Sequence, residues 1–162
     1  MNNSTSKPLM PCNSIATVLA SFFGAGCSRI APGTAGSMAA LPLVWSCALA
    51  GWALYSLFTI VVLVAGIWIC DKAAKEIGVH DHGGIVWDEV AGMLVTMWFI
   101  PVTWQNLFIG FLLFRLFDIW KPWPIRMLDL KVHGGLGIML DDLVAGLFAN
   151  ISLWLILIYI AG

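Results

Sequence analysis

Five long apolar runs, separated by short polar segments, dominate the chain. They cover residues 38–53, 55–70, 90–104, 107–120 and 143–161. The first two runs carry no charge and predict a helical hairpin that turns near Gly51. A helix that crosses a bilayer needs about 20 residues, so the third and fourth runs are short. We expect them to form a hairpin that only partly crosses, or helices that are tilted or buried among the others.

The composition indicates a membrane protein. Hydrophobic residues make up 60% of the 162 positions and charged residues only 10%, whereas soluble domains have about 25% charged residues. We therefore expect an all-α fold, a compact multi-helix integral membrane bundle. Residues 1–12 are expected to form a flexible tail, and residues 13–162 a single membrane-embedded domain whose first helix lies within 13–26. The net charge of −1 gives no indication of a nucleic-acid partner.

The charged side chains are expected to gather on one side of the membrane. If the runs are helices that alternate in direction, segments 28–37, 71–89 and 118–142 all face the same side. The segments on the opposite side carry no charged residue. The positive-inside rule makes the charged side cytoplasmic, so the sequence predicts a polar site at the cytoplasmic interface.

Carboxylates are placed where the expected helices meet this interface. Asp88 and Glu89 are expected to begin the third helix, Asp118 to end the fourth, and Asp141 and Asp142 to begin the fifth. If these helices pack together, the carboxylates repel one another and raise one another's pKa. A divalent cation such as Mg²⁺, which takes a few carboxylates and leaves positions for water and phosphate oxygens, would offset this repulsion.

Helix capping is the alternative explanation for these acids. An acid near a helix N-terminus gains about 0.3–1 kcal/mol from the helix dipole. Capping accounts for one acid per helix, but less well for the doublets Asp88–Glu89 and Asp141–Asp142. It does not account for Asp118, which is expected at a C-terminal end.

Basic and glycine-rich segments on the same side are candidates for binding phosphate. Arg115 can pair with Asp118 three residues later or face a phosphate. Lys121 can extend its ammonium to the interface or contact a phosphate. The segment 31–37 offers the backbone N–H groups of a helix start, or a plain helix cap. His80 and His82, which flank Asp81, are suited to a metal site or an ordinary polar loop.

These features together favour metal-assisted phosphate chemistry on a lipid. A transporter would be expected to place ionisable groups near the midplane, whereas the charges here stop within about one helical turn of the surface. The DGxxAR pattern of CDP-alcohol phosphatidyltransferases and the PSGH segment of type 2 phosphatidic acid phosphatases are both absent. A non-enzymatic structural or transport protein, with the acids as helix caps, stays the alternative.

Four segments resemble the motif set of the bacterial phosphatidylglycerophosphatase A family. They are APGTAGS at 31–37, HDHGGIVWDE at 80–89, FRLFDIWKPWPI at 114–125 and HGGLGIMLDD at 133–142. The resemblance extends over about residues 13–161. It implies a multi-pass protein of the bacterial inner membrane that hydrolyses the terminal phosphate of phosphatidylglycerophosphate, with Mg²⁺ as cofactor and its active site facing the cytoplasm.

The motif positions then give a set of candidate site residues. We take Glu89, Asp118 and Asp142 as metal ligands because they lie nearest the three helix ends. The remaining motif carboxylates, Asp81, Asp88 and Asp141, are candidate catalytic groups. The candidate phosphate contacts are Thr34, Gly36, Ser37, Arg115 and Lys121. The expected partners are the phospholipid substrate and the membrane, and no oligomeric state is predicted.

Overall fold

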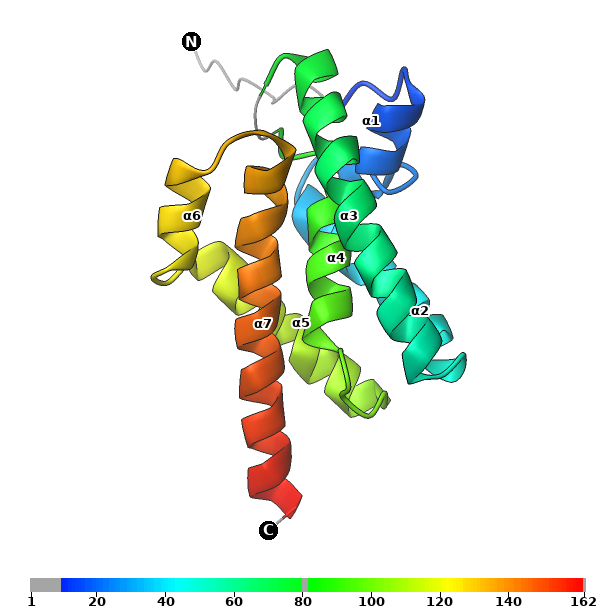
Figure 1. The fold of residues 1–162 in the computed structure, drawn as a ribbon, viewed down its shortest axis with the longest axis vertical. Coiled ribbons are helices and arrows are strands. Elements are labelled where there is room, and N and C mark those ends of the chain that lie inside the picture. The colour runs from blue at the N-terminus through cyan, green and yellow to red at the C-terminus, as the bar shows by residue number, and fades with distance from the viewer. Residues whose placement is uncertain (1–9, 80–81, 162) are drawn as a thin grey trace.

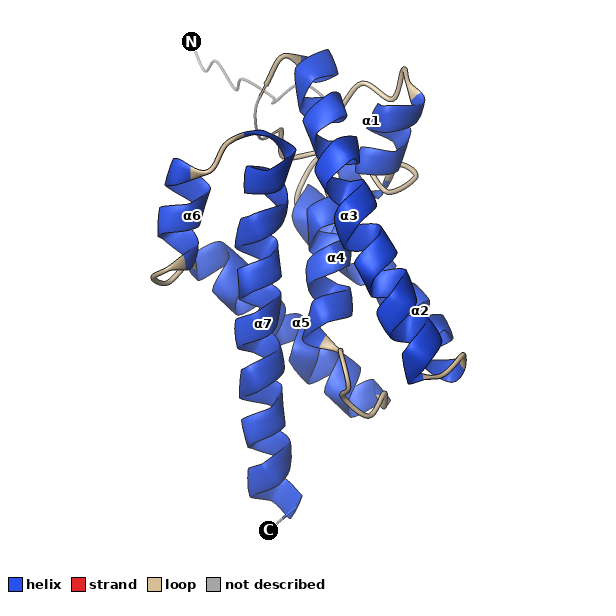
Figure 2. Ribbon diagram, viewed as in Figure 1, coloured by secondary structure: helices blue, strands red, loops and turns tan. Residues whose placement is uncertain are grey.

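The structure is a computed structural model that describes residues 10–79 and 82–161. Within these residues every regular element is a helix, as predicted (Figures 1 and 2). The α-helices are α1 (Ile15–Ala20), α2 (Pro32–Leu49), α3 (Trp52–Ile77), α4 (Trp87–Thr96), α5 (Trp104–Trp120), α6 (Ile125–Lys131) and α7 (Gly134–Ala161). A short 3-10 helix, η1 (Ala25–Cys27), follows α1.

Successive long helices alternate in direction along the long axis of the molecule. In Figure 1, α2, α4 and α7 run down the view and α3 and α5 run up it. Among the described residues, α3 and α7 are long and apolar enough to cross a membrane. The alternation therefore agrees with the sequence prediction, although the helices begin and end at different residues from the apolar runs.

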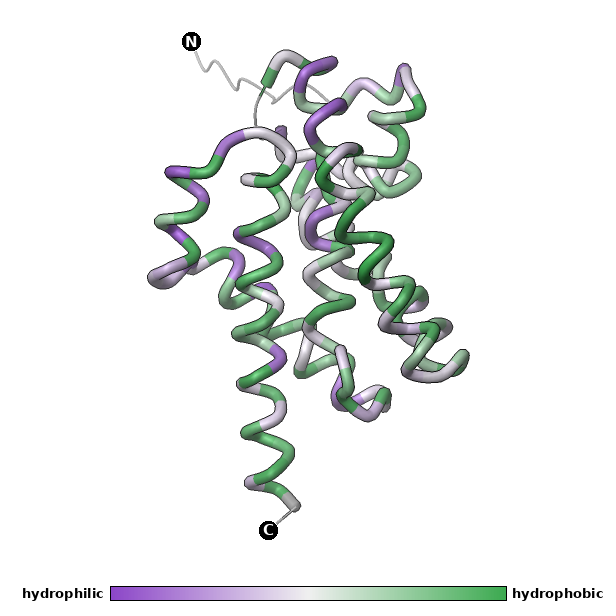
Figure 3. Tube along the Cα trace, viewed as in Figure 1, coloured by the Kyte–Doolittle hydropathy of each residue, from purple (hydrophilic) through white to green (hydrophobic). Residues whose placement is uncertain are grey.

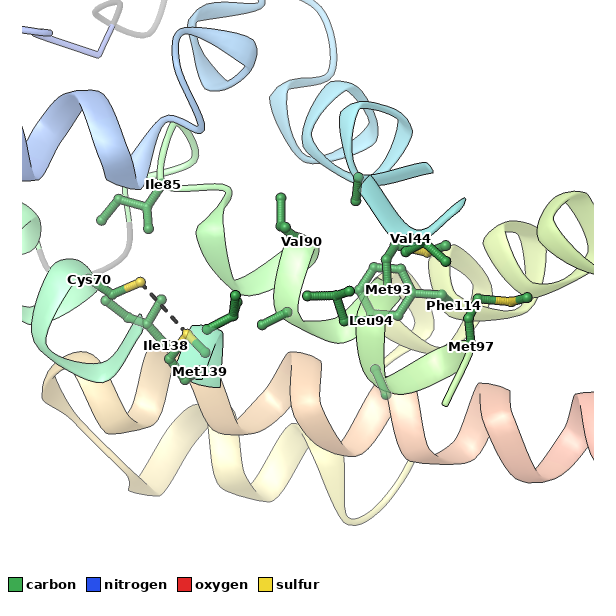
Figure 4. Packing of buried hydrophobic residues seen from close by; sticks show 14 of the residues in the cluster. Val44, Cys70, Ile85, Val90, Met93, Leu94, Met97, Phe114, Ile138 and Met139 are labelled. Carbon is green, nitrogen blue, oxygen red and sulfur yellow. Dashed lines mark hydrogen bonds between the residues drawn. The ribbon is translucent and has the colours of Figure 1, made fainter. Parts of the chain in front are cut away.

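Helix α4 occupies the centre of the bundle. It packs against α2, α3, α5 and α7, and every residue from Val90 to Thr96 is buried. Its side chains continue into an apolar core with Val44 of α2, Phe114 of α5 and Met139 of α7 (Figure 4). An apolar helix surrounded in this way is held mainly by burial of its side chains, which is the dominant favourable term in folding.

The third apolar run is only partly helical. Helix α4 ends at Thr96, and residues 97–103 form a loop that leads to α5. Free backbone carbonyls are costly in an apolar environment. Here the amide of Asn150 on α7 donates 2.9 Å hydrogen bonds to the carbonyls of Thr96 and Trp98, and the Tyr55 hydroxyl donates a 2.7 Å bond to Leu94 O. These side chains explain how the helix can end within an apolar run.

The prediction that Asp141 and Asp142 begin the last helix is wrong. Helix α7 already begins at Gly134, so both acids lie two turns inside it. The glycine-rich segment is helical because it packs closely against α3. A Cβ atom on Gly135 would lie only 1.9 Å from the carbonyl oxygen of Ile67, and Gly135 N donates a 3.3 Å hydrogen bond to Asp71.

The fold also moves the other predicted helix boundaries. The first hairpin begins at Pro32, six residues before the apolar run, because Pro and small residues are acceptable in a first helical turn. The N-terminal helix predicted within 13–26 is reduced to α1 and η1. The sharp bend between them, at Gly24 with a φ of 98°, ends the α-helical geometry.

Two glycines allow α4 and α7 to approach closely. A Cβ on Gly146 would lie 2.6 Å from the carbonyl oxygen of Gly92, and a Cβ on Gly92 would lie 2.4 Å from Phe114. Each glycine lies four residues, about one helical turn, after an acid, namely Asp142 and Asp88. The close contact therefore brings the acidic turns of α4 and α7 together.

Much of the outer surface is apolar. In Figure 3 hydrophilic segments gather mainly in the upper half of the molecule, around α6, the start of α7 and the end of α3. The lower part of α7 is hydrophobic, and Leu155 and Ile158 on it are each 63% exposed. Soluble monomers rarely expose contiguous apolar surface of this kind, which is typical of contact with lipid.

We predict that Gly146→Ala destabilises the bundle. The added methyl group meets the backbone of Gly92, which cannot move without separating α4 from α7, and overpacking of this kind costs about 1–3 kcal/mol. The measurement is thermal unfolding in detergent. Gly83→Ala is the matched control, since a Cβ there meets nothing within 4 Å. Equal stability of the two variants would contradict the prediction.

Candidate metal and phosphate site

Three acids from two helices form a compact cluster between α4 and α7. Asp88 and Glu89 lie in the first turn of α4, and Asp142 lies on the face of α7 that packs against it. One carboxylate oxygen from each of the three lies within 4.8 Å of the others. Asp88 and Asp142 are buried, with residue exposures of 7% and 3%. The expected meeting of acids from separate helices is therefore present in the fold.

The surroundings of Glu89 strongly perturb its carboxyl group. Burial raises the pKa of Glu89 from its ordinary value of 4.5 to about 8, and the neighbouring charges of Asp142 and Asp118 raise it further against the opposing effects of Asp88 and Arg115. Within the described part of the chain, its buried Oε2 atom has no hydrogen-bond partner. An ionised carboxylate here lacks compensation from the protein alone.

Asp118 lies beside this cluster and forms an ion pair with Arg115. The guanidinium Nη1 lies 2.6 Å from Asp118 Oδ2, and both side chains are mostly buried, with exposures of 16% and 14%. The Asp118 carboxyl is also close enough to Asp142 for the two groups to interact electrostatically. The sequence prediction named Asp118 as a ligand with Glu89 and Asp142, whereas the geometry places Asp88 in that closest set.

Helix α2 forms the opposite wall of the site. Ser37 is fully buried, donates a 2.8 Å hydrogen bond to Gly33 O and accepts a long 3.5 Å bond from Arg115. The sequence analysis considered Gly33 only as part of the 31–37 helix start. A Cβ there would lie 2.3 Å from Glu89 Oε1 and 3.1 Å from Arg115, so a larger residue would displace the ends of both side chains. Its place directly after Pro32, at a helix start, was the available signal.

The other predicted phosphate contacts on α2 have different surroundings. Gly36 packs against Val86, where an added Cβ would lie 2.5 Å from the Val86 Cβ, so its role here is close packing. Thr34 is half-buried in the first turn of α2. The sequence analysis also considered a side-chain cap for this segment. The N-cap of α2 is Ala31, which makes no side-chain hydrogen bond to the helix. Asp81 lies outside the described residues.

Lys121 connects the acids of α7 to those of α6. Its ammonium lies 2.6 Å from Asp141 and 3.0 Å from Asp129, a partner that the sequence analysis did not single out. Burial by itself lowers the pKa of Lys121, but the bonds to Asp141 and the charge of Asp129 outweigh it and raise the pKa. Lys121 therefore stays protonated, and Asp141 orients it beside the carboxylate cluster.

Helix capping does not account for this arrangement. Asp88 does accept a 3.1 Å bond from the backbone N–H of Glu89, as an acid in a first turn can. Asp142, however, lies two turns inside α7, where neighbouring backbone N–H groups are already bonded within the helix. Arg115 offsets the charge of these acids only in part, so either protonation, as the raised pKa of Glu89 indicates, or a bound cation would relieve their repulsion.

The donor set fits a hard divalent cation. The cluster offers only carboxylate oxygens, and Mg²⁺ and Ca²⁺ prefer oxygen ligands. Two buried atoms that have no hydrogen-bond partner among the described residues, Glu89 Oε2 and Arg115 Nε, lie in the same region. An anion such as a phosphate beside a cation would satisfy both types of atom at once.

The chain has clear similarity to known proteins. The family model described as "Phosphatidylglycerophosphatase A" matches residues 18–157. An Escherichia coli (strain K12) protein named Phosphatidylglycerophosphatase A is 50% identical over 133 residues, which cover 82% of this chain and 77% of that protein. A Haemophilus influenzae protein of the same name is 43% identical over 141 residues, 86% of each chain. No solved structure gives a significant match.

We predict that Glu89→Gln stabilises the metal-free protein at high pH. A carboxyl with its pKa raised to about 8 keeps its proton in the folded state, whereas in the unfolded chain it ionises near 4.5. The folded state is therefore progressively destabilised as pH rises between these values. In EDTA, the melting temperature of the original protein should fall between about pH 5 and about pH 8, and Glu89→Gln should reduce this fall.

The same variant should lose the stabilisation that Mg²⁺ confers, because an amide is a much weaker ligand for this cation than a carboxylate. Glu76→Gln, which alters an exposed acid at the end of α3, is the control. A pH-dependent fall in melting temperature that is the same with and without the Glu89 carboxylate would refute the assignment.

Proposed function

Because the chain belongs to the phosphatidylglycerophosphatase A family, we propose that it hydrolyses the terminal phosphate of phosphatidylglycerophosphate, giving phosphatidylglycerol and inorganic phosphate in phospholipid biosynthesis. The observation that supports this most directly is the buried cluster of Asp88, Glu89 and Asp142 beside Arg115. This cluster combines ligands for a cation with a donor for a phosphate, which are the groups that hydrolysis of a phosphate monoester requires.

The proposed cofactor is Mg²⁺, held by Asp88, Glu89 and Asp142. The close spacing of their oxygens and the uncompensated Glu89 carboxylate support this choice. A bound Mg²⁺ would polarise a phosphoryl oxygen and lower the pKa of a coordinated water. Asp118 would support the ligand set through its contact with Asp142 and its ion pair with Arg115.

Arg115 and Lys121 would bind the phosphate that is removed. Arg115 is fixed by Asp118 and Ser37 with its Nε atom buried, so its guanidinium is preorganised for a charged acceptor. Lys121 is fixed by Asp141 and Asp129. Groups held in place in this way stabilise negative charge on the phosphoryl group without reorganising during the reaction.

In the proposed reaction a water oxygen attacks the terminal phosphorus and the bond from phosphorus to the glycerol oxygen breaks. The water gives up a proton, and the departing glycerol oxygen gains one to become a hydroxyl. The carboxylates of the site are the groups available to accept the proton from water. The products are an alcohol on the lipid and inorganic phosphate.

The protein is proposed to be an integral membrane protein of the bacterial inner membrane with this site on the cytoplasmic side. The two long apolar helices and the exposed apolar surface of α7 support insertion. The gathering of hydrophilic segments in the upper half of Figure 3, with most of the Lys and Arg residues, supports the orientation. An amphiphilic substrate would then reach the site from the plane of the bilayer.

Phosphate release from phosphatidylglycerophosphate in nonionic detergent micelles, with Mg²⁺ and with EDTA, tests the proposal. We predict release that requires Mg²⁺. Glu89→Gln and Asp142→Asn should each reduce the rate by at least about 100-fold, because each removes a charged ligand from a water-poor site.

Glu76→Gln is again the control and should keep the original rate, since this acid is exposed and distant in sequence from the cluster. Release that is unaffected by EDTA would exclude the cation. No release by the folded protein in either condition would exclude the proposed activity.

A further inference from the structure

A cavity of about 570 Å³ lies between the end of α5 and helix α6 and shares Lys121 with the proposed site. Three cations line it, Lys121, Arg126 and Lys131, together with the apolar side chains of Trp120, Trp123 and Leu130. The three apolar side chains are 70%, 78% and 66% exposed. The cavity therefore combines positive charge with a rim suited to the edge of a bilayer.

Two of the three cavity cations form no ion pair within the described residues. Lys121 is paired with Asp141 and Asp129. Arg126 and Lys131 are exposed, and within 10–79 and 82–161 no carboxylate lies within ion-pairing distance of either. Two cations that share a concave surface without acidic partners favour an anionic ligand.

Lys121 joins this cavity to the carboxylate cluster. Its side chain lines the cavity, and its ammonium lies 2.6 Å from Asp141, which directly precedes the cluster acid Asp142. A ligand that spans both regions therefore needs one negative group at the cluster and a second on the side of α6.

We propose that this cavity binds the phosphodiester of the lipid substrate, and so selects lipids that carry two phosphates. The inference rests on the proposed function, in which the terminal phosphate lies at the cluster. In such a lipid a glycerol unit separates the terminal phosphate from the phosphodiester, and the acyl chains follow the phosphodiester. Arg126 and Lys131 bind the phosphodiester, and the exposed Trp and Leu side chains contact the adjoining acyl and interfacial region.

Steady-state rates on phosphatidylglycerophosphate in nonionic micelles, measured against its surface mole fraction, test this proposal. Arg126→Gln with Lys131→Gln should raise the apparent KM by about tenfold, the loss expected for charge-assisted hydrogen bonds, and leave kcat within about twofold. Lys75→Gln is the matched control, since this cation pairs with Asp71 and does not line the cavity.

Inhibition separates recognition of the phosphodiester from general attraction to negative surfaces. Phosphatidylglycerol keeps the phosphodiester and lacks the terminal phosphate, whereas oleate is an anionic amphiphile without phosphate. Phosphatidylglycerol should inhibit the original protein and inhibit the double variant about tenfold less, while the response to oleate should be unchanged.

Three results would overturn the inference. An unchanged KM in the double variant would show that the cavity does not bind substrate. An equal loss of response to phosphatidylglycerol and oleate would show that the cations attract any anionic surface. A lower kcat at constant KM would indicate a structural role. If the original protein releases no phosphate, the proposed function fails, and this inference fails with it.

Discussion

The central constraint on this fold is that it brings together carboxylates that repel one another. Asp88, Glu89, Asp118 and Asp142 come from three helices and meet where little water is available to screen them. In the metal-free protein, protonation of Glu89 and contacts elsewhere in the bundle offset that repulsion. The glycine contact between α4 and α7 and the buried ion pair of Arg115 with Asp118 do so directly. A cation would convert the same arrangement from a cost into a stabilising interaction.

Helix α4 is short and lies at the centre of the bundle, and both features place its acidic first turn inside the protein. A helix that crosses the whole bundle would carry its first turn to a surface, whereas α4 starts inside the protein with its acids facing α7. Its C-terminal carbonyls then need partners within the protein, and Asn150 and Tyr55 provide them. Irregular backbone of this kind is tolerated in an apolar setting only where neighbouring side chains satisfy it. By bonding the C-terminal carbonyls of α4, these polar side chains allow the helix, and with it the acids, to lie inside the bundle.

The residues outside the cluster act through their positions relative to it. Gly33 leaves room for Glu89 and Arg115, and Ser37 holds Arg115 from the side of α2. Lys121 connects the cluster to the cavity under α6. The proposed active site and the proposed phosphodiester pocket therefore share Lys121, and exposed apolar side chains that suit a lipid border the pocket.

The sequence alone determined the class of fold and the identity of the acids. Long apolar runs must form helices because backbone groups in an apolar setting must bond within their own segment, and the motif acids follow from residue type and order. It did not determine which acids meet. Asp88, and not Asp118, belongs to the closest set of acids, because Asp118 pairs with Arg115. Asp142 lies inside α7 because the helix already begins at the glycines that pack against α3. Those outcomes depend on helix–helix contacts between residues distant in sequence, which only the tertiary structure decides.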